Sequence, residues 1–201
     1  MSWRHPWTGR GLLLVLGLMI GWAGGRFWPE TPIHAVATDG GENFAIATGP
    51  VDENTEAFFF LDFLTGQLRG AVVSNQTRDF QTLYNANVLQ DLTSVIQMKN
   101  TQIRAANAGR RNTAVQPTPE IQLPKTPHYV MVTGYADLRR GAAGSVRPGR
   151  SVVYVAETNT GIVLAYAVPW SPENHAANRP FAQPLTLWAA DQFSSVVLRP
   201  E

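Results

Sequence analysis

Two short stretches have nearly the same design: Ala57–Gly66, AFFFLDFLTG, and Val152–Gly161, VVYVAETNTG. Each is a run of mainly apolar residues that leads through an acid to a Thr-Gly pair. A second apolar run follows each of them, QLRGAVV at 67–73 and IVLAYAV at 162–168. Two β-rich runs separated by a glycine-containing turn are typical of a β-hairpin. The sequence therefore predicts two hairpins of the same design.

The turn of each hairpin has an acidic residue three positions before the threonine. A carboxylate at that place can accept hydrogen bonds from the amides of its own turn. The glycine can adopt the positive φ that closes the hairpin. We therefore expect both acids to build turns. The predicted turn residues are Asp62, Thr65 and Gly66 in the first hairpin and Glu157, Thr160 and Gly161 in the second.

The similarity between the two halves extends beyond the hairpins. Phe44–Gly49 resembles Tyr129–Gly134, and a weaker likeness pairs Leu89–Ile96 with Ala189–Val196. The offset between the copies grows from 85 to 95 to 100 residues, as expected if loops lengthened in the second copy. Similar segments in the same order indicate an internal duplication.

A helix is predicted after each hairpin. Apolar residues recur at helical spacing from Phe80 to Ile96, and a shorter helix is indicated between Trp188 and Val197. The predicted fold class is therefore α+β, a duplicated βββα domain with a mainly antiparallel sheet. Its parts are a first repeat at 42–99, a proline-rich connector at 100–127 and a second repeat at 128–201.

The second hairpin resembles the blade hairpins of quinoprotein-type β-propellers. Turns in that family follow an alanine–acid–Thr-Gly pattern, which Ala156, Glu157, Thr160 and Gly161 match in order, and Tyr166 stands where the family has tryptophan. The resemblance implies a hairpin geometry but no quinone cofactor, because two copies cannot close a propeller. The whole-chain pattern also resembles a group of uncharacterised, single-span bacterial membrane-anchored proteins of unknown function, and this resemblance brings no activity with it.

The N-terminal segment is predicted to be a transmembrane helix. Gly11–Gly25 carries no charge, Arg10 and Arg26 close it, and tryptophans stand near both ends. With its flanking aromatic residues the segment would span roughly 33 Å as a helix, about one hydrocarbon core. We therefore expect a cytoplasmic N-terminus and membrane anchor at 1–28 and a tether at 29–41.

Three glycines of this segment, Gly17, Gly21 and Gly25, recur every four residues and lie along one side of a helix. Such stripes let membrane helices approach closely and pack together. A cleaved signal peptide is the alternative, with Ala23 and Gly25 as the small residues before the cleavage site. The positive charge of the first ten residues places the N-terminus in the cytoplasm. The expected location is the bacterial inner membrane, crossed once, with the main domain in the periplasm.

Two loops are candidate contact sites. One is rich in glycine and carries four arginines, which suit an anionic lipid headgroup or an acidic partner surface. The other is a polar loop with a tryptophan and a histidine, and it is the best candidate for a small ligand site. The arginines are Arg139, Arg140, Arg147 and Arg150, and the residues of the ligand loop are Trp170, Glu173, His175 and Arg179.

The strands indicate contact with another protein. Phe58–Leu61 and Val152–Val155 are consecutive apolar residues, which predicts that both faces of the sheet are covered. Two helices can cover one face, so the other needs a partner protein or a second copy. The expected partners are therefore membrane lipid and protein. A net charge of +1 gives no bulk attraction to nucleic acid.

No catalytic set can be assembled from the sequence. The four histidines share no ligand spacing and cysteine is absent, so no metal or other cofactor is predicted. The expected function is that of a non-enzymatic, membrane-anchored accessory or structural subunit that works by protein–protein contact in a larger membrane or envelope complex. The alternatives are a periplasmic ligand-binding or sensor module, and a hydrolase that uses carboxylates such as Asp62, Glu157 or Glu173.

Overall fold

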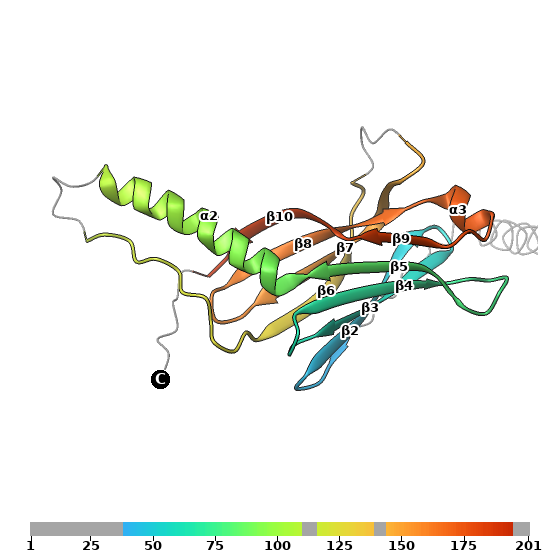
Figure 1. Ribbon diagram of the computed structural model, residues 1–201, viewed down its shortest axis with the longest axis horizontal. Helices are drawn as coiled ribbons and strands as arrows, with labels where there is room; N and C mark the ends of the chain where they lie inside the picture. Colours follow the sequence, from blue (N-terminus) through green and yellow to red (C-terminus); the bar gives the residue numbers. More distant parts are fainter. Residues whose placement is uncertain (1–37, 110–115, 139–143, 195–201) are drawn as a thin grey trace, which may run out of the picture. The chain divides into compact units, whose positions relative to one another are not determined.

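The computed structural model describes residues 38–109, 116–138 and 144–194, which form two β-sheets, one long helix and one short helix (Figure 1). The predicted anchor at 1–28, with its glycine stripe, lies outside these residues. The predicted tether lies outside them except for its last residues. Those residues form a short strand, β1 (Thr38–Gly40), so the domain begins before the predicted end of the tether at residue 41.

The first sheet has the strand order β1-β2-β3-β4-β5-β9. Neighbouring strands are antiparallel except for β5 and β9, which are parallel. The strands β2 to β5 form a continuous meander, in which each strand pairs with the next one along the chain. Their bounds are β2 (Phe44–Asp52), β3 (Thr55–Asp62), β4 (Gln67–Val73) and β5 (Phe80–Asn87), and the edge strand beside β5 is β9 (Phe181–Pro184).

The second sheet is antiparallel throughout, with the order β10-β8-β7-β6. It is also a meander, interrupted in the chain by α3 and β9. Equivalent hydrogen bonds follow the two hairpins: the Val88 amide donates to the Gly66 carbonyl and the Phe193 amide to the Gly161 carbonyl, each at 2.8 Å. The strands are β6 (Tyr129–Tyr135), β7 (Arg147–Glu157), β8 (Ile162–Trp170) and β10 (Thr186–Gln192).

The long helix α2 (Val88–Ala108) begins later than the sequence predicts. Residues 80–87, assigned to the helix by their spacing, form β5 instead. The side chain of Asn87 caps the helix, because its Oδ1 accepts a hydrogen bond from the Gln90 amide at 3.0 Å. The helix also runs into the predicted connector at 100–127, and residues 116–127 of that connector form neither helix nor strand.

The second predicted helix is wrong. The residues from Thr186 to Gln192 form β10, which pairs with β8 and leaves Trp188 at a β-bulge. A short helix, α3 (Pro172–Ala176), lies earlier in the chain, where Ser171 caps its N-terminus and proline occupies its first turn. Figure 1 shows α2 and α3 at opposite ends of the strands.

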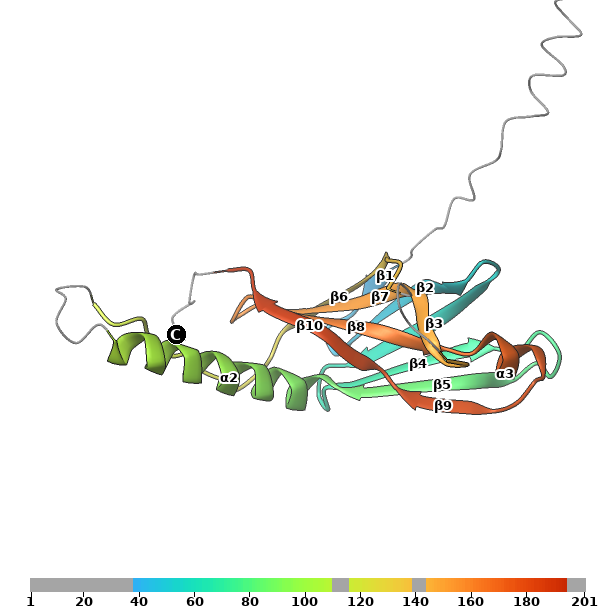
Figure 2. The same cartoon turned by 90° about the horizontal axis from the view of Figure 1, so that it is seen from above.

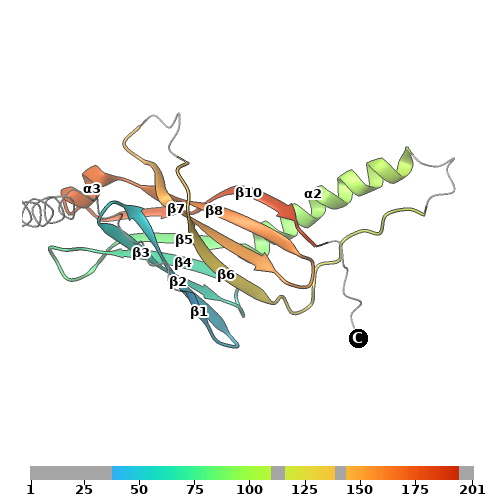
Figure 3. The same ribbon diagram turned by 180° about the vertical axis from the view of Figure 1, so that it is seen from behind.

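The core lies between the two sheets. β2 packs against β6 and β7, as Figure 3 shows from behind, and the hydroxyl of Thr133 donates to the backbone carbonyl of Thr48. The helix α2 closes the core at one end with four buried residues, and the Tyr166 hydroxyl donates to Asp91 at 2.8 Å. The largest fully buried apolar side chains include Phe59, Leu61 and Leu68 of the first sheet and Met131, Leu164 and Tyr166 of the second.

The consecutive apolar residues of β3 do not bury both faces of their sheet. Phe59 and Leu61 are fully buried, but Phe58, which precedes them, is 38 % exposed. Side chains alternate along a strand, so one face of β3 is in the core and the other faces outward. The described residues therefore cover only one face of β3, and the cover of its second face by a partner protein or a second copy stays a prediction.

Candidate functional site

The first hairpin turn is exposed and is held by the side chain of Asp62. Its Oδ1 accepts from the Leu64 amide at 2.9 Å and its Oδ2 from the Thr65 hydroxyl at 2.8 Å. The hydrogen bond from Thr65 lowers the pKa of the Asp62 carboxyl, with smaller contributions from the turn amides and from Arg69. Gly66 has φ of 65°, the conformation that closes the turn.

The second hairpin turn has the same backbone conformation, with Gly161 at φ of 67°. Its acid, Glu157, is only 1 % exposed. One carboxylate oxygen accepts from the Thr160 amide and hydroxyl, both at 2.7 Å. The other accepts from the Asn159 amide and side chain and from the His128 amide at 3.2 Å, outside the turn. All these bonds fix the polypeptide, so Glu157 has a structural role.

Tyr129 lies beside this buried acid at the start of β6. Burial, and to a smaller degree the charge of Glu157, raise the pKa of Tyr129 to about 12. Its buried hydroxyl has no hydrogen-bond partner. The ring packs against Phe63 of the first hairpin, with the ring centroids 5.9 Å apart. The first hairpin therefore contacts β6, the strand that pairs with β7 of the second hairpin, through this aromatic pair.

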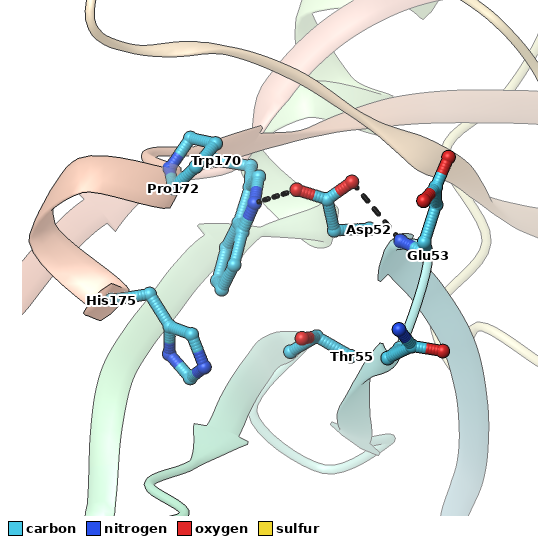
Figure 4. Close-up of a pocket in the computed structure, with 7 residues that line it drawn as sticks. Asp52, Glu53, Thr55, Trp170, Pro172 and His175 are labelled. Carbon is cyan, nitrogen blue, oxygen red and sulfur yellow. Dashed lines mark hydrogen bonds between the residues drawn. The ribbon is translucent and has the colours of Figure 1, made fainter.

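A hollow of about 290 Å³ lies at the opposite ends of the strands (Figure 4). It forms where the turn between β2 and β3 meets the end of β8 and the start of α3. The indole N–H of Trp170 donates to Asp52 at 2.9 Å, and this bond joins the two sheets. The lining residues are Asp52, Glu53, Asn54, Thr55, Trp170, Pro172 and His175.

His175 is the residue of the hollow whose hydrogen bonding is incomplete. Its ring lies against Trp170, with the centroids 5.0 Å apart and the planes tilted by 47°. Its Nδ1 is buried and has no hydrogen-bond partner. The hollow thus combines an indole, an imidazole and two carboxylates that are paired with Arg150, a set that suits a small polar ligand.

Only two of the four residues of the predicted ligand loop lie at the hollow. Trp170 and His175 line the hollow, whereas Glu173 and Arg179 do not, and both are exposed. The backbone carbonyl of Arg179 instead accepts from the buried Gln81 side chain at 3.3 Å. The carboxylates Asp52 and Glu53 were not predicted. They are far away in the sequence, and no local pattern distinguishes them from ordinary turn residues.

The predicted arginine loop has a different arrangement from the one expected. Arg139 and Arg140 lie outside the described residues, and Arg147 is half-buried at the start of β7. The guanidinium of Arg150 donates to Glu53 at 2.7 Å and lies 3.9 Å from Asp52. These carboxylates raise the pKa of Arg150. The charge of Arg150 is therefore paired within the domain, and the structure does not support the prediction that Arg150 binds an anionic partner.

The outward faces of both sheets carry exposed apolar side chains. Strand pairing aligns Phe58, Ala71 and Leu83 across the first sheet, and Leu83 is 51 % exposed. The same holds for Val132, Tyr154 and Ala165 across the second, where Val132 is 45 % exposed. Contiguous exposed apolar surface is a common mark of an interaction site.

Among the described residues, no helix is long and apolar enough to cross a membrane, and no three histidine or acidic side chains are grouped to bind a metal ion. The acids of the hydrolase alternative do not form one site, since Asp62 and Glu157 each hold their own turn and Glu173 is exposed on α3. Comparison of the chain with protein-family models, with curated proteins and with solved structures finds no match.

Proposed function

We propose that this chain is a membrane-anchored accessory subunit whose extracytoplasmic domain works by protein–protein contact. The proposal rests on the apolar side chains that are exposed on the outward faces of the two sheets. In the first sheet, Val73 and Phe80 on adjacent strands are 57 % and 58 % exposed. Burial of apolar area contributes about 25 cal/mol per Å², so such a surface favours association with a complementary one.

The test compares the two outward faces with a polar surface of the same domain. Single residues are replaced by a photo-crosslinking amino acid at Leu83 on the first sheet, at Val132 on the second, and at the exposed Gln90 on α2 as the control. The full chain is crosslinked in native membranes. We expect protein adducts from at least one sheet position and none from the control. No adduct from either sheet position would contradict the proposal.

A ligand-binding or sensor module is the second candidate, and His175 favours it. A buried imidazole nitrogen without a partner costs free energy unless a bound group completes its hydrogen bonding. The test is a thermal-shift screen of small polar metabolites on the full chain, with His175→Ala as the matched variant. A ligand that stabilises the parent chain but not the variant would support this function, and the same shift in both would count against the hollow.

A further inference from the structure

The outward side of the strands β2–β5 carries a group of apolar side chains. We call this side of the sheet the outer β2–β5 face. Two of its rings, Phe44 and Phe60, stack with their centroids 5.4 Å apart and their planes within 15°. The face spans four hydrogen-bonded strands. Its main apolar residues are Phe44, Phe58, Phe60, Val73, Phe80 and Leu83.

The charges of the outer β2–β5 face are arranged asymmetrically. The exposed cation Arg69 lies on β4, in register with Phe60 of β3. The acids Glu56 and Asp62 lie on β3, on either side of Phe58 and Phe60. When two copies are packed face to face about a twofold axis that exchanges β3 with β4, Arg69 of each copy lies over Phe60 of the other and within reach of Asp62, two residues further along that strand. The face is therefore complementary to itself.

The size of the face indicates how tightly two copies would bind. Four strands at about 4.8 Å and seven residues at about 3.4 Å cover roughly 450 Å² of one copy, and roughly 900 Å² for a pair. Specific interfaces bury about 1,200 Å² or more in total. A pair formed through this face alone is weak in dilute solution. Confinement of anchored copies in one membrane raises their effective concentration and favours the pair.

We infer that the outer β2–β5 face binds the same face of a second copy, forming a sheet-on-sheet homodimer of membrane-tethered chains. This inference rests on the proposed function and names its partner. Face-to-face sheets lie about 10 Å apart with their strands inclined by about 30°. The apolar side chains of the two copies then interdigitate, and the paired charges fix the orientation.

The absence of cysteine from the chain makes a clean test possible. Ala71→Cys places a thiol near the centre of the outer β2–β5 face, and Ala165→Cys places the matched control on the outward face of the second sheet. The full chain is reconstituted in lipid vesicles at low density. A thiol-specific crosslinker of about 10 Å is used, because facing sheets are too far apart for a disulfide. We expect crosslinked dimers from Ala71→Cys and only monomers from Ala165→Cys.

Two further substitutions in the Ala71→Cys background test the contacts. Phe58→Ser removes apolar surface and should lower the crosslinked fraction roughly tenfold, whereas Val132→Ser on the second sheet should leave it unchanged. Arg69→Glu should also lower it by placing like charges together, and adding Asp62→Arg should restore it. The charge variants keep the test valid if Phe58→Ser does not fold.

Equal crosslinking of Ala71→Cys and Ala165→Cys would overturn the homodimer. A thiol at position 71 that a small maleimide cannot reach in the monomer would also overturn it, because the chain itself would then cover the face. Adducts that join Leu83 to a different protein in native membranes would show that another partner binds this face. They would overturn the homodimer but leave the proposed function intact. The absence of adducts at both sheets would reject both.

Discussion

The hairpin turns at Asp62 and Glu157 have the same conformation but different surroundings. Both close with glycine at positive φ and both acids bind their own threonine. Asp62 lies in an exposed turn, whereas Glu157 is buried and also binds the His128 amide. The pattern of acid, threonine and glycine therefore specifies the backbone of the turn, and the surrounding chain determines how much stability the acid contributes.

The largest difference is expected when each acid is replaced by alanine. Glu157→Ala leaves several buried donors without an acceptor and should lower the free energy of unfolding by about 3 kcal/mol or more. Asp62→Ala should lower it much less, because water replaces the lost acceptor. Urea unfolding of the full chain in detergent micelles, followed by circular dichroism, measures both. Equal losses would mean that burial does not distinguish the two turns.

The turn glycines provide the second comparison. A Cβ at Gly161 would lie 2.9 Å from the Ser194 amide nitrogen, and a Cβ at Gly66 would lie 3.2 Å from the Leu89 amide nitrogen. Both substitutions also force an L-residue into positive φ. Gly161→Ala should cost about 2–3 kcal/mol and Gly66→Ala about 1–2 kcal/mol in the same unfolding assay. A larger loss at Gly66 would reverse the comparison.

Alkaline pH should destabilise the protein through Tyr129, which lies beside the buried turn of Glu157. The pKa of Tyr129 is about 12 in the folded protein and about 10 in an unfolded chain. The neutral form is favoured on folding, so this stability is present below pH 10 and is lost as the pH rises from 10 through 12. Tyr129→Phe should flatten that limb of the stability curve. If the pH dependence is unchanged in the variant, Tyr129 is not the source of the alkaline loss of stability. Tyr166 is then the alternative source, because burial is the main cause of its raised pKa.

The smallest effect is expected at acid pH, from the exposed turn. The lowered pKa of Asp62 means that its contribution is present above the unfolded value of about 3.9 and is lost as the pH falls through the folded value. Asp62→Asn should therefore reduce the stability difference between pH 6 and pH 3 slightly. Nuclear magnetic resonance titration of the Asp62 carboxyl measures the shift directly, and an ordinary pKa would contradict the prediction.

Local signals predicted the hairpins, because turn chemistry depends on a few neighbouring residues. The start of α2 was harder to predict, since the apolar residues between Phe80 and Tyr84 suit a strand as well as a helix. Asn87, a favoured N-cap residue, was the available signal for the boundary. The strand β10 was mistaken for a helix because its bulge at Trp188 breaks the alternation of side chains.

The hollow shows a different limit of sequence reasoning. Trp170 and His175 were chosen because they are close together in a polar loop. Asp52 completes the site through a hydrogen bond to Trp170 that joins opposite halves of the chain. Nothing in the residues around Asp52 indicates this contact. A site of this kind depends on how two sheets pack, and a single sequence carries no direct record of that packing.

The strand β9 makes the folding of both sheets interdependent. It pairs with β5 in parallel, joining Thr82 to Phe181, before the chain returns as β10 to the second sheet (Figure 2). Contacts so distant in sequence form slowly, because a large loop must close first. During synthesis, β5 is therefore an unpaired edge strand of the first meander until β9 has been made. An unpaired edge of this kind is prone to aggregation. The last strands complete both sheets at nearly the same time, which favours cooperative folding of the two halves.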